Sequence, residues 1–225
     1  MWNAGPTEMK LVIYCAGGFG REILDIAYRV NFVTKRWETI TFIDDVLASG
    51  TLVSGVSTQK FSDVKRLCGG GDCEFVIANG EPSIRKMLAD KIHDHPLAIL
   101  CDPTVIISAT AKVGDGLLVA AYSSIASDAK IGMNVAINTQ SVVGHDVEIG
   151  DHSVISSMVN IGGGTTVGES SYLGMGAQIK ERVKIGSHSI IGMGSIVYKD
   201  IPDGVIALGN PARVVRKNER HKIFE

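Results

Sequence analysis

The residue of this chain best suited to chemistry is His145, in the sequence Val143-Gly144-His145-Asp146. A neutral imidazole can remove a proton near pH 7, as a general base does when an amine attacks a thioester. Val143 belongs to a regular row of aliphatic residues, and the position two residues after it points outward from the structure that such a row predicts. From these residues alone, a catalytic base and a solvated surface histidine are both open interpretations.

Glycines and acidic residues near the start of the chain could bind a nucleotide. The segment from Cys15 to Gly20 is rich in glycine and lies between an expected strand and an expected helix, where backbone N–H groups can hold a phosphate. Asp44 and Asp45 end the next expected strand, where a carboxylate can accept a hydrogen bond from a ribose hydroxyl. A tight turn with helix-packing glycines would give the same pattern. A redox dinucleotide is not expected, because it would normally need a second half-domain, for which the sequence shows no pattern.

The element that positions His145 is a six-residue repeat. Every sixth residue from Ile107 to Val197 is Val, Ile or Leu, and the residue after it is usually small. Such a repeat predicts a prism with three short strands per turn, so that eighteen residues make one coil and coils stack about 4.8 Å apart. One column of equivalent positions then consists of Ser127, His145, Gly163, Glu181 and Lys199.

The same spacing argues against a metal site. Some γ-class carbonic anhydrases use this kind of prism and hold zinc with three histidines across a subunit interface, so the distance within one chain tests whether two histidines of that chain could share a metal. His152 and His188 share a phase here but lie two coils apart, about 9–10 Å, whereas Zn–N bonds are about 2.0 Å. His145 has another phase, so we expect no metal.

The residues before the repeat predict a small parallel α/β sheet, because expected strands and helices alternate there. We therefore divide the chain into an irregular leader (1–8), an α/β domain (9–102), the prism (103–212) and a basic tail (213–225). The tail could approach phosphates, but a solvated or subunit-packing segment is the simpler interpretation. The expected strands are 10–15, 39–44, 74–79 and 97–100, the expected helices are 21–30, 63–67 and 82–93, and 17–20 is the expected turn.

Composition restricts the partners. A net charge of -2 without a long run of one sign disfavours nucleic-acid binding, and no apolar stretch approaches the ~20 residues that span a bilayer. We expect a cytoplasmic protein whose partners are small molecules and other copies of itself. Its four cysteines show no disulfide framework, so free thiols are expected, including Cys68 and Cys73.

Several motifs together resemble one family, the bacterial sugar acyltransferases of the sialic acid O-acetyltransferase type. This family includes N-acetyltransferases that act on nucleotide-linked 4-amino-4,6-dideoxy sugars, and the resemblance covers nearly everything after Met9. The matching motifs are Gly17-Gly18-Phe19-Gly20-Arg21-Glu22, Phe42-Ile43-Asp44-Asp45, Gly80 with Arg85, the hexads, Val143-Gly144-His145-Asp146, Asp200-Ile201-Pro202 and Gly209-Asn210-Pro211-Ala212.

The resemblance implies a fold and an assembly. The fold is a small N-terminal Rossmann-like parallel α/β domain followed by a left-handed parallel β-helix. The assembly is a homotrimer with acetyl-CoA in the groove between two prisms, and the N-terminal domain holds a nucleotide-sugar acceptor.

The resemblance also implies roles for individual residues. His145 is the general base, and Asp146 orients its imidazole. Gly163, one coil from His145, would leave room for the pantetheine arm of acetyl-CoA. The implied acceptor-binding residues are Gly17, Gly18, Phe19, Asp44, Asp45 and Gly80, and the implied acetyl-CoA contacts are Val154, Gly163, Met175 and Met193.

Two positions depart from the family pattern. Val154 stands where some relatives have a second cofactor-contacting histidine, so only a backbone contact could survive there. Asp102-Pro103 replaces a His-Pro pair at the domain junction.

The predicted activity is acetyl-CoA-dependent N-acetylation of a nucleotide-linked 4-amino-4,6-dideoxy sugar in bacterial glycan synthesis. The alternatives are O-acetylation of sialic acid or another sugar, and a non-catalytic scaffold that binds sugar nucleotides.

Overall fold

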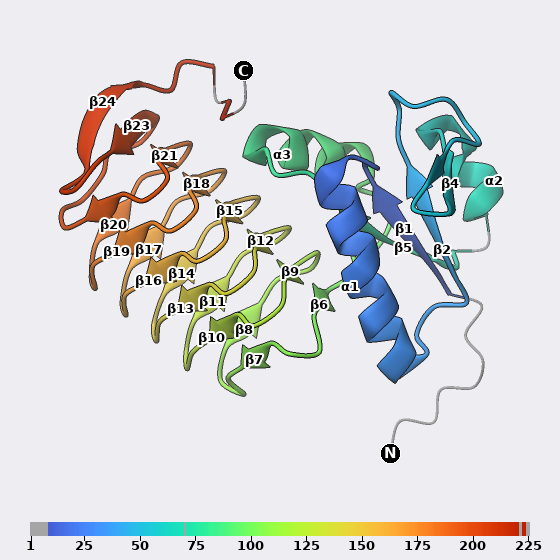
Figure 1. Cartoon of the computed structure of the whole chain (residues 1–225), viewed down its shortest axis with the longest axis horizontal. Coiled ribbons are helices and arrows are strands. Elements are labelled where there is room, and N and C mark those ends of the chain that lie inside the picture. Colours follow the sequence, from blue (N-terminus) through green and yellow to red (C-terminus); the bar gives the residue numbers. More distant parts are fainter. Residues whose placement is uncertain (1–8, 70, 221, 224–225) are drawn as a thin grey trace.

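A computed structural model describes residues 9–69, 71–220 and 222–223 of the 225-residue chain. A small α/β domain is followed by a β-solenoid, and the two lie side by side (Figure 1). The predicted fold class, a Rossmann-like domain followed by a left-handed parallel β-helix, is confirmed. Within the described residues, no helix is both long and apolar enough to cross a membrane.

The N-terminal sheet has the strand order β3-β4-β2-β1-β5. Strands β1, β2 and β5 are parallel and occupy three of the four predicted segments, and the aliphatic runs of β1 and β5 are buried. The fourth prediction, a strand over 97–100 in this sheet, was wrong: Leu97 forms only an isolated bridge with Phe75, and β6 (Leu100–Cys101) pairs with β9 (Leu118–Val119) of the solenoid. The antiparallel pair β3 and β4 was not predicted from the sequence. The bounds are β1 Lys10–Tyr14, β2 Thr39–Ile43, β3 Leu52–Val53, β4 Val56–Gln59 and β5 Cys73–Ile77.

Helices cover both faces of this sheet. Helix α1 (Gly18–Thr34) begins within the glycine-rich segment, so the prediction of a turn through Gly20 was wrong. Gly20 lies directly against the carbonyl of Cys15, where a Cβ would overlap it, and this close approach lets the helix start immediately after the strand. The other face carries η1 (Phe61–Asp63), α2 (Val64–Leu67) and α3 (Pro82–Lys91).

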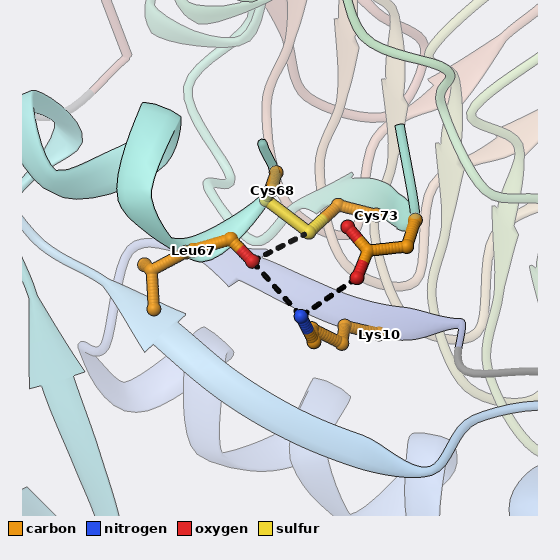
Figure 2. Close-up of a disulfide and its surroundings, with 5 residues drawn as sticks. Lys10, Leu67, Cys68 and Cys73 are labelled. Carbon is orange, nitrogen blue, oxygen red and sulfur yellow. Dashed lines mark hydrogen bonds and ion pairs between the residues drawn. A yellow bond between two sulfur atoms is a disulfide. The ribbon is translucent and has the colours of Figure 1, made fainter. Parts of the chain in front are cut away.

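Cys68 and Cys73 form a disulfide, which corrects the expectation of free thiols (Figure 2). Cys68 follows α2 and Cys73 begins β5, and a turn in which Gly71 N donates to Cys68 O brings their Cα atoms to 5.4 Å. This separation lies in the range that a disulfide requires. Lys10 braces the turn by donating to Leu67 O and to the Asp72 carboxylate.

The repeat folds as predicted into a prism of two-residue strands. Its three parallel sheets contain the strand orders β22-β19-β16-β13-β10-β7, β20-β17-β14-β11-β8 and β24-β23-β21-β18-β15-β12-β9-β6, the last ending in an antiparallel pair. The strands are β6 Leu100–Cys101, β7 Ile106–Ile107, β8 Lys112–Val113, β9 Leu118–Val119, β10 Ser124–Ile125, β11 Lys130–Ile131, β12 Ala136–Ile137, β13 Val142–Val143, β14 Glu148–Ile149, β15 Val154–Ile155, β16 Asn160–Ile161, β17 Thr166–Val167, β18 Tyr172–Leu173, β19 Gln178–Ile179, β20 Lys184–Ile185, β21 Ile190–Ile191, β22 Ile196–Val197, β23 Val205–Leu208 and β24 Arg213–Lys217.

The hexad aliphatics fill the axis of the prism, and small hydroxyl residues close its corners. Val143, Ile161 and Ile179 are buried in one continuous core. Ser141 is fully buried, and its hydroxyl donates to Ser156 O while it accepts from Val159 N. Ser153 and Ser171 repeat this arrangement, which explains why the corner positions are small and polar.

The α/β domain packs on the sheet that contains β9, β12 and β15. Leu118, Ala136 and Val154 point outward from three successive coils and are buried in the same cluster as α1 residues such as Ile26. At the domain junction, the buried Asp102 carboxylate pairs with Arg29 Nε at 2.6 Å. The residue that departs from the family's His-Pro pair therefore joins α1 to the start of the solenoid.

Arg85 forms a second connection between the domains. Its side chain is fully buried, and it donates to Asn134 O at 2.8 and 3.0 Å and to Ile77 O at 2.6 Å. The Asn134 amide returns a hydrogen bond to Arg85 O. Burial lowers the pKa of Arg85 to about 9, so the guanidinium stays charged at pH 7 and is solvated by carbonyl groups instead of water.

Candidate active site

His145 lies on a corner of the prism between β13 and β14. Val143 and Ile149 are buried on either side, so the residues between them cross the corner with the His145 side chain 69% exposed. A Cβ at Gly144 would lie 2.8 Å from Gly163 N, so only glycine lets the corners of successive coils stack this closely. The outward orientation predicted from the repeat is therefore observed.

A carboxylate fixes the orientation of the imidazole. His145 Nδ1 and Asp146 Oδ2 are 2.8 Å apart, and Asp146 has a φ of 57°, a left-handed conformation that Asp tolerates better than most residues. When Nδ1–H donates to the carboxylate, Nε2 carries the lone pair. The imidazole then presents a basic nitrogen on the side away from Asp146.

Gly163 lies beside that nitrogen, as the eighteen-residue period predicts. An ideal Cβ at this glycine would be 2.5 Å from His145 Nε2 and 2.6 Å from its Cε1. The coils are joined here by hydrogen bonds from Gly164 N to His145 O and from Arg182 N to Gly163 O. The space next to Nε2 thus exists because residue 163 has no side chain.

The other predicted acetyl-CoA contacts lie elsewhere in the chain. Met175 and Met193 are exposed in corners that precede β19 and β22, whereas His145 follows β13 at the opposite edge of the same sheet. Val154 is buried beneath the N-terminal domain, and its N–H donates to Ser171 O. One chain therefore does not bring these residues to His145.

The predicted acceptor-binding glycines lie at the carboxyl end of the N-terminal sheet. A Cβ at Gly17 would meet no atom within 4 Å, and one at Gly18 would meet only an Arg21 Nη atom at 3.9 Å. Phe19 is partly buried against the cluster between the domains. The backbone at the start of α1 is therefore open to a ligand at Gly17 and Gly18.

Asp44 organises this glycine-rich segment through its carboxylate. One oxygen accepts from Ala16 N at 2.9 Å, and the other accepts from Val46 N and Leu47 N. Partial burial opposes ionisation, but these backbone hydrogen bonds outweigh it and lower the pKa of Asp44. Asp44 thus lies near the turn, as its position at the end of a strand predicts, but the protein's own backbone uses both of its oxygens.

Asp45 belongs to a cluster of polar side chains on the other face of the sheet. It accepts from Tyr14 Oη at 2.5 Å and from Lys91 Nζ at 2.6 Å. Burial opposes ionisation of Asp45, yet the bonds from Lys91 and Tyr14 lower its pKa to about 2, while burial and Asp45 together raise the pKa of Tyr14. This carboxylate has a structural role in linking β1, β2 and α3.

Gly80 lies where β5 leads into α3, and its neighbour Glu81 contacts the tail. Ile223 N donates to Glu81 Oε2 at 2.8 Å across 142 residues of sequence. The tail also begins with a strand, β24, which pairs with β23. Sequence reasoning missed this contact because Arg213–Lys217 has no hexad periodicity and the segment after it is short and charged.

Two family models match the two parts of the chain. Residues 10–92 match the PglD N-terminal domain, and residues 128–163 and 164–199 match the bacterial transferase hexapeptide with six repeats. In this order, the two parts of the chain are similar to those of left-handed β-helix sugar acyltransferases. A comparison with curated protein sequences gives no significant match.

Solved structures of several acyltransferases resemble this one over nearly the whole chain. A histidine-to-asparagine mutant of perosamine N-acetyltransferase from Caulobacter crescentus is 28% identical, with a TM-score of 0.86 over 94% of this chain and 99% of that one. The acetyltransferase domain of PglB from Neisseria gonorrhoeae FA1090 is 26% identical, with a TM-score of 0.85 over 94% and 100%. WeeI from Acinetobacter baumannii AYE is 29% identical, with a TM-score of 0.84 over 92% and 100%.

The described part of this acyltransferase contains no group of three or more His, Cys, Asp or Glu side chains placed to hold a metal ion. His152, which shares a phase with His188, instead lies against the N-terminal domain. Its Nδ1 is 3.1 Å from Asn134 Nδ2, and burial lowers its pKa.

Proposed function

We propose that this acyltransferase transfers acetyl from acetyl-CoA to the amine of a nucleotide-linked 4-amino-4,6-dideoxy sugar. The proposal is based on the arrangement of His145, Asp146 and Gly163. The exposed imidazole is oriented by a carboxylate, and its Nε2 lies beside a position that lacks a side chain. Such an arrangement suits a proton acceptor next to a narrow ligand.

His145 acts as the general base in the proposed reaction. As the sugar amine attacks the thioester carbonyl, Nε2 takes the proton from the nitrogen, and Asp146 stabilises the imidazolium that forms. The proton can then pass to the departing CoA thiolate. The products are the N-acetyl sugar nucleotide and free CoA.

Backbone amides are proposed to stabilise the oxyanion of the tetrahedral intermediate. In the glycine run beside His145, Gly162 N and Gly164 N donate to Ile179 O and His145 O. Gly163 N has no hydrogen-bond acceptor among the described residues, so it can donate to a substrate.

The solved relatives support the choice of both substrates. The perosamine N-acetyltransferase structures contain CoA and GDP-perosamine, and a structure of the PglB domain contains acetyl coenzyme A. The open glycines at the carboxyl end of the N-terminal sheet supply the expected place for the nucleotide sugar here. We propose that the product serves bacterial glycan synthesis.

We propose that the active site is completed by a second copy within a homotrimer. In one chain, Met175 and Met193 lie at the opposite edge of the sheet from His145. A neighbouring prism could bring its own methionines to this histidine, and acetyl-CoA would then lie between two copies. Repeat folds of this kind have flat faces suited to such contacts.

The activity is tested by measuring thiol release from acetyl-CoA with a panel of acceptors. We expect release with a 4-amino sugar nucleotide and an N-acetyl product by mass spectrometry. Release only with sialic acid would establish O-acetylation instead, and acceptor binding without release from any acceptor would establish a scaffold.

A further inference from the structure

A cavity of about 640 Å³ lies between the tail and the outer face of the solenoid sheet that the N-terminal domain partly covers. Its apolar wall contains Ile190 of β21 and Ile206 of β23. Its polar wall contains Arg216, Lys217, Arg220 and Lys222 of the tail, together with Glu219. This size and combination of walls are typical of a site for a small molecule with an apolar body and an anionic group.

The charged groups of this wall are mostly cations. Arg216, Lys217, Arg220 and Lys222 form no ion pair with any residue in the described part of the chain. Clustered like charges repel one another, and an anion bound among them relieves that repulsion. Phosphate oxygens, which accept several charge-assisted hydrogen bonds at once, are a suitable partner.

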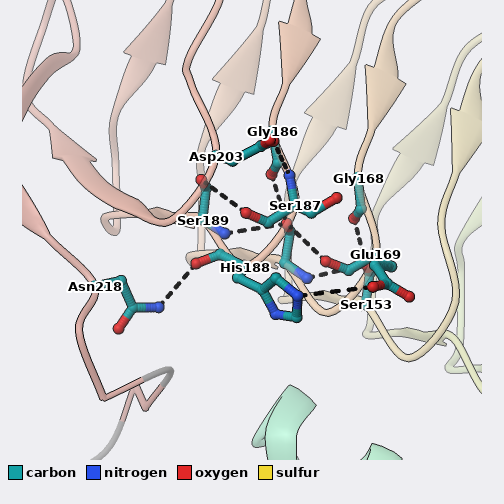
Figure 3. Close-up of polar contacts among 10 residues, drawn as sticks. Ser153, Gly168, Glu169, Gly186, Ser187, His188, Ser189, Asp203 and Asn218 are labelled. Carbon is teal, nitrogen blue, oxygen red and sulfur yellow. Dashed lines mark hydrogen bonds and ion pairs between the residues drawn. The ribbon is translucent and has the colours of Figure 1, made fainter.

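The backbone of the tail holds these cations in place. β24 pairs with β23, and the next residue, Asn218, is buried. Its side-chain amide donates to His188 O at 2.9 Å, and its N–H donates to Gly204 O at 2.7 Å. Figure 3 shows Asn218 reaching the corner that carries His188 and Ser187.

The cavity adjoins the proposed acceptor loops. Ile223, one of its lining residues, donates its N–H to Glu81, which directly follows Gly80. In Figure 1 the ends of α1 and α3 that follow β1 and β5 face the last coils of the solenoid, with the tail beside them. Ligands of open parallel sheets bind beyond the carboxyl ends of the strands, which is the direction in which this cavity lies.

We infer that the tail cations bind the diphosphate of the nucleotide-linked acceptor, so that the acceptor site is shared by the N-terminal domain and the tail. This inference rests on the proposed function for the identity of the ligand. Acetyl-CoA carries phosphates too, but its predicted contacts Met175 and Met193 do not line this cavity. The position next to Gly80 therefore favours the acceptor.

The direct test is calorimetric titration of the full chain with UDP, GDP and dTDP. We expect the Arg216→Ala/Arg220→Ala variant to weaken binding of the preferred nucleotide about 100-fold, about tenfold for each lost charge-assisted bond. The control is Arg213→Ala/Lys112→Ala, which removes the same charge from positions outside the cavity and should bind as wild type does. Equal binding by both variants, or no nucleotide binding by wild type, would overturn the inference.

Steady-state kinetics distinguishes whether the tail cations bind the phosphates of the nucleotide sugar or those of acetyl-CoA. The KM for the nucleotide sugar should rise about 100-fold in Arg216→Ala/Arg220→Ala, while the KM for acetyl-CoA stays within twofold. A rise in the acetyl-CoA KM instead would assign the cations to CoA. Suppose that wild type binds a nucleotide and the variant binds it weakly, but wild type acetylates no acceptor. The proposed function then fails while the phosphate site stands.

Discussion

Two histidines seven residues apart in the same solenoid have opposite surroundings. His145 is exposed on a corner, paired with the Asp146 carboxylate and adjacent to Gly163. His152 is 5% exposed beneath the N-terminal domain, where it meets the Asn134 amide near the buried Arg85. A free Nε2 next to a carboxylate-bound Nδ1 suits proton transfer, whereas a buried imidazole held neutral suits packing between domains. The phase turns His145 away from the N-terminal domain, and that domain covers His152. His188 has the phase of His152 but lies two coils further on, where its side chain is 33% exposed near Glu169, so the coil matters as well as the phase.

We expect the largest effect on activity from His145→Ala. Loss of a general base should lower kcat by about 10² to 10⁴ while the chain keeps its fold and oligomeric state. Thiol release and size-exclusion chromatography measure both. His93→Ala is the matched control, because His93 is another exposed histidine next to an aspartate, with 3.1 Å between His93 Nε2 and Asp94 Oδ1. Turnover like that of wild type in His145→Ala would remove this residue from the mechanism.

Gly163→Ala tests whether the space beside Nε2 matters. The new Cβ would be 2.5 Å from His145 Nε2, so the ring must move, and we expect kcat to fall about 10- to 100-fold. The loss should vanish in a His145→Ala background, where there is no ring to displace. If the two losses multiply instead, Gly163 acts independently of the histidine.

Asp146→Asn should have a smaller effect, about a tenfold fall in kcat, because the pair is exposed and water can partly replace the carboxylate. Asparagine also tolerates the positive φ of this position, so the corner should keep its shape. Asp128→Asn is the control, since Asp128 has a φ of 60° one coil earlier and is preceded by Ser127 instead of a histidine. Equal activities of the two variants would show that Asp146 does not assist His145.

The smallest effect concerns His152 and appears in stability. Because burial lowers its folded-state pKa below 6.5, the unfolded chain binds more protons as the pH falls below 6.5, and stability falls with it. The Tm of wild type should therefore drop between pH 7 and pH 5, and in His152→Asn the drop should be smaller by about 2–4 °C. An unchanged pH dependence in this variant, with His93→Asn as control, would show that other groups cause the drop.

The periodic parts of the structure could be predicted from the sequence, and the contacts between distant parts could not. The hexads place His145 on the outside and Gly163 beside it because each coil repeats the geometry of the last. The Cys68–Cys73 disulfide, the hairpin of β3 and β4 and the start of α1 depend on local turns without a period. Neither Asn134 as the partner of Arg85 nor Glu81 as the partner of Ile223 leaves a signal in the sequence.

The acceptor residues show a second limit of prediction. Sequence reasoning placed Asp44 and Asp45 at the carboxyl end of a strand, and the structure agrees. Their carboxylates, however, are used by Ala16 and Lys91, among others, because a strand end also has backbone amides and neighbouring cations to satisfy. A motif can identify the position of a side chain without showing which group it binds.

The packing of one domain across Leu118, Ala136 and Val154 has a consequence for how the molecule unfolds. In a simple repeat array, each coil contacts only its neighbours, so the end coils can unravel while the middle stays intact. Here three successive coils share one apolar interface, and the tail connects the last coils back to Glu81. Separating any of these coils therefore requires breaking contacts with the N-terminal domain as well, so we expect the solenoid and the α/β domain to melt in a single cooperative transition.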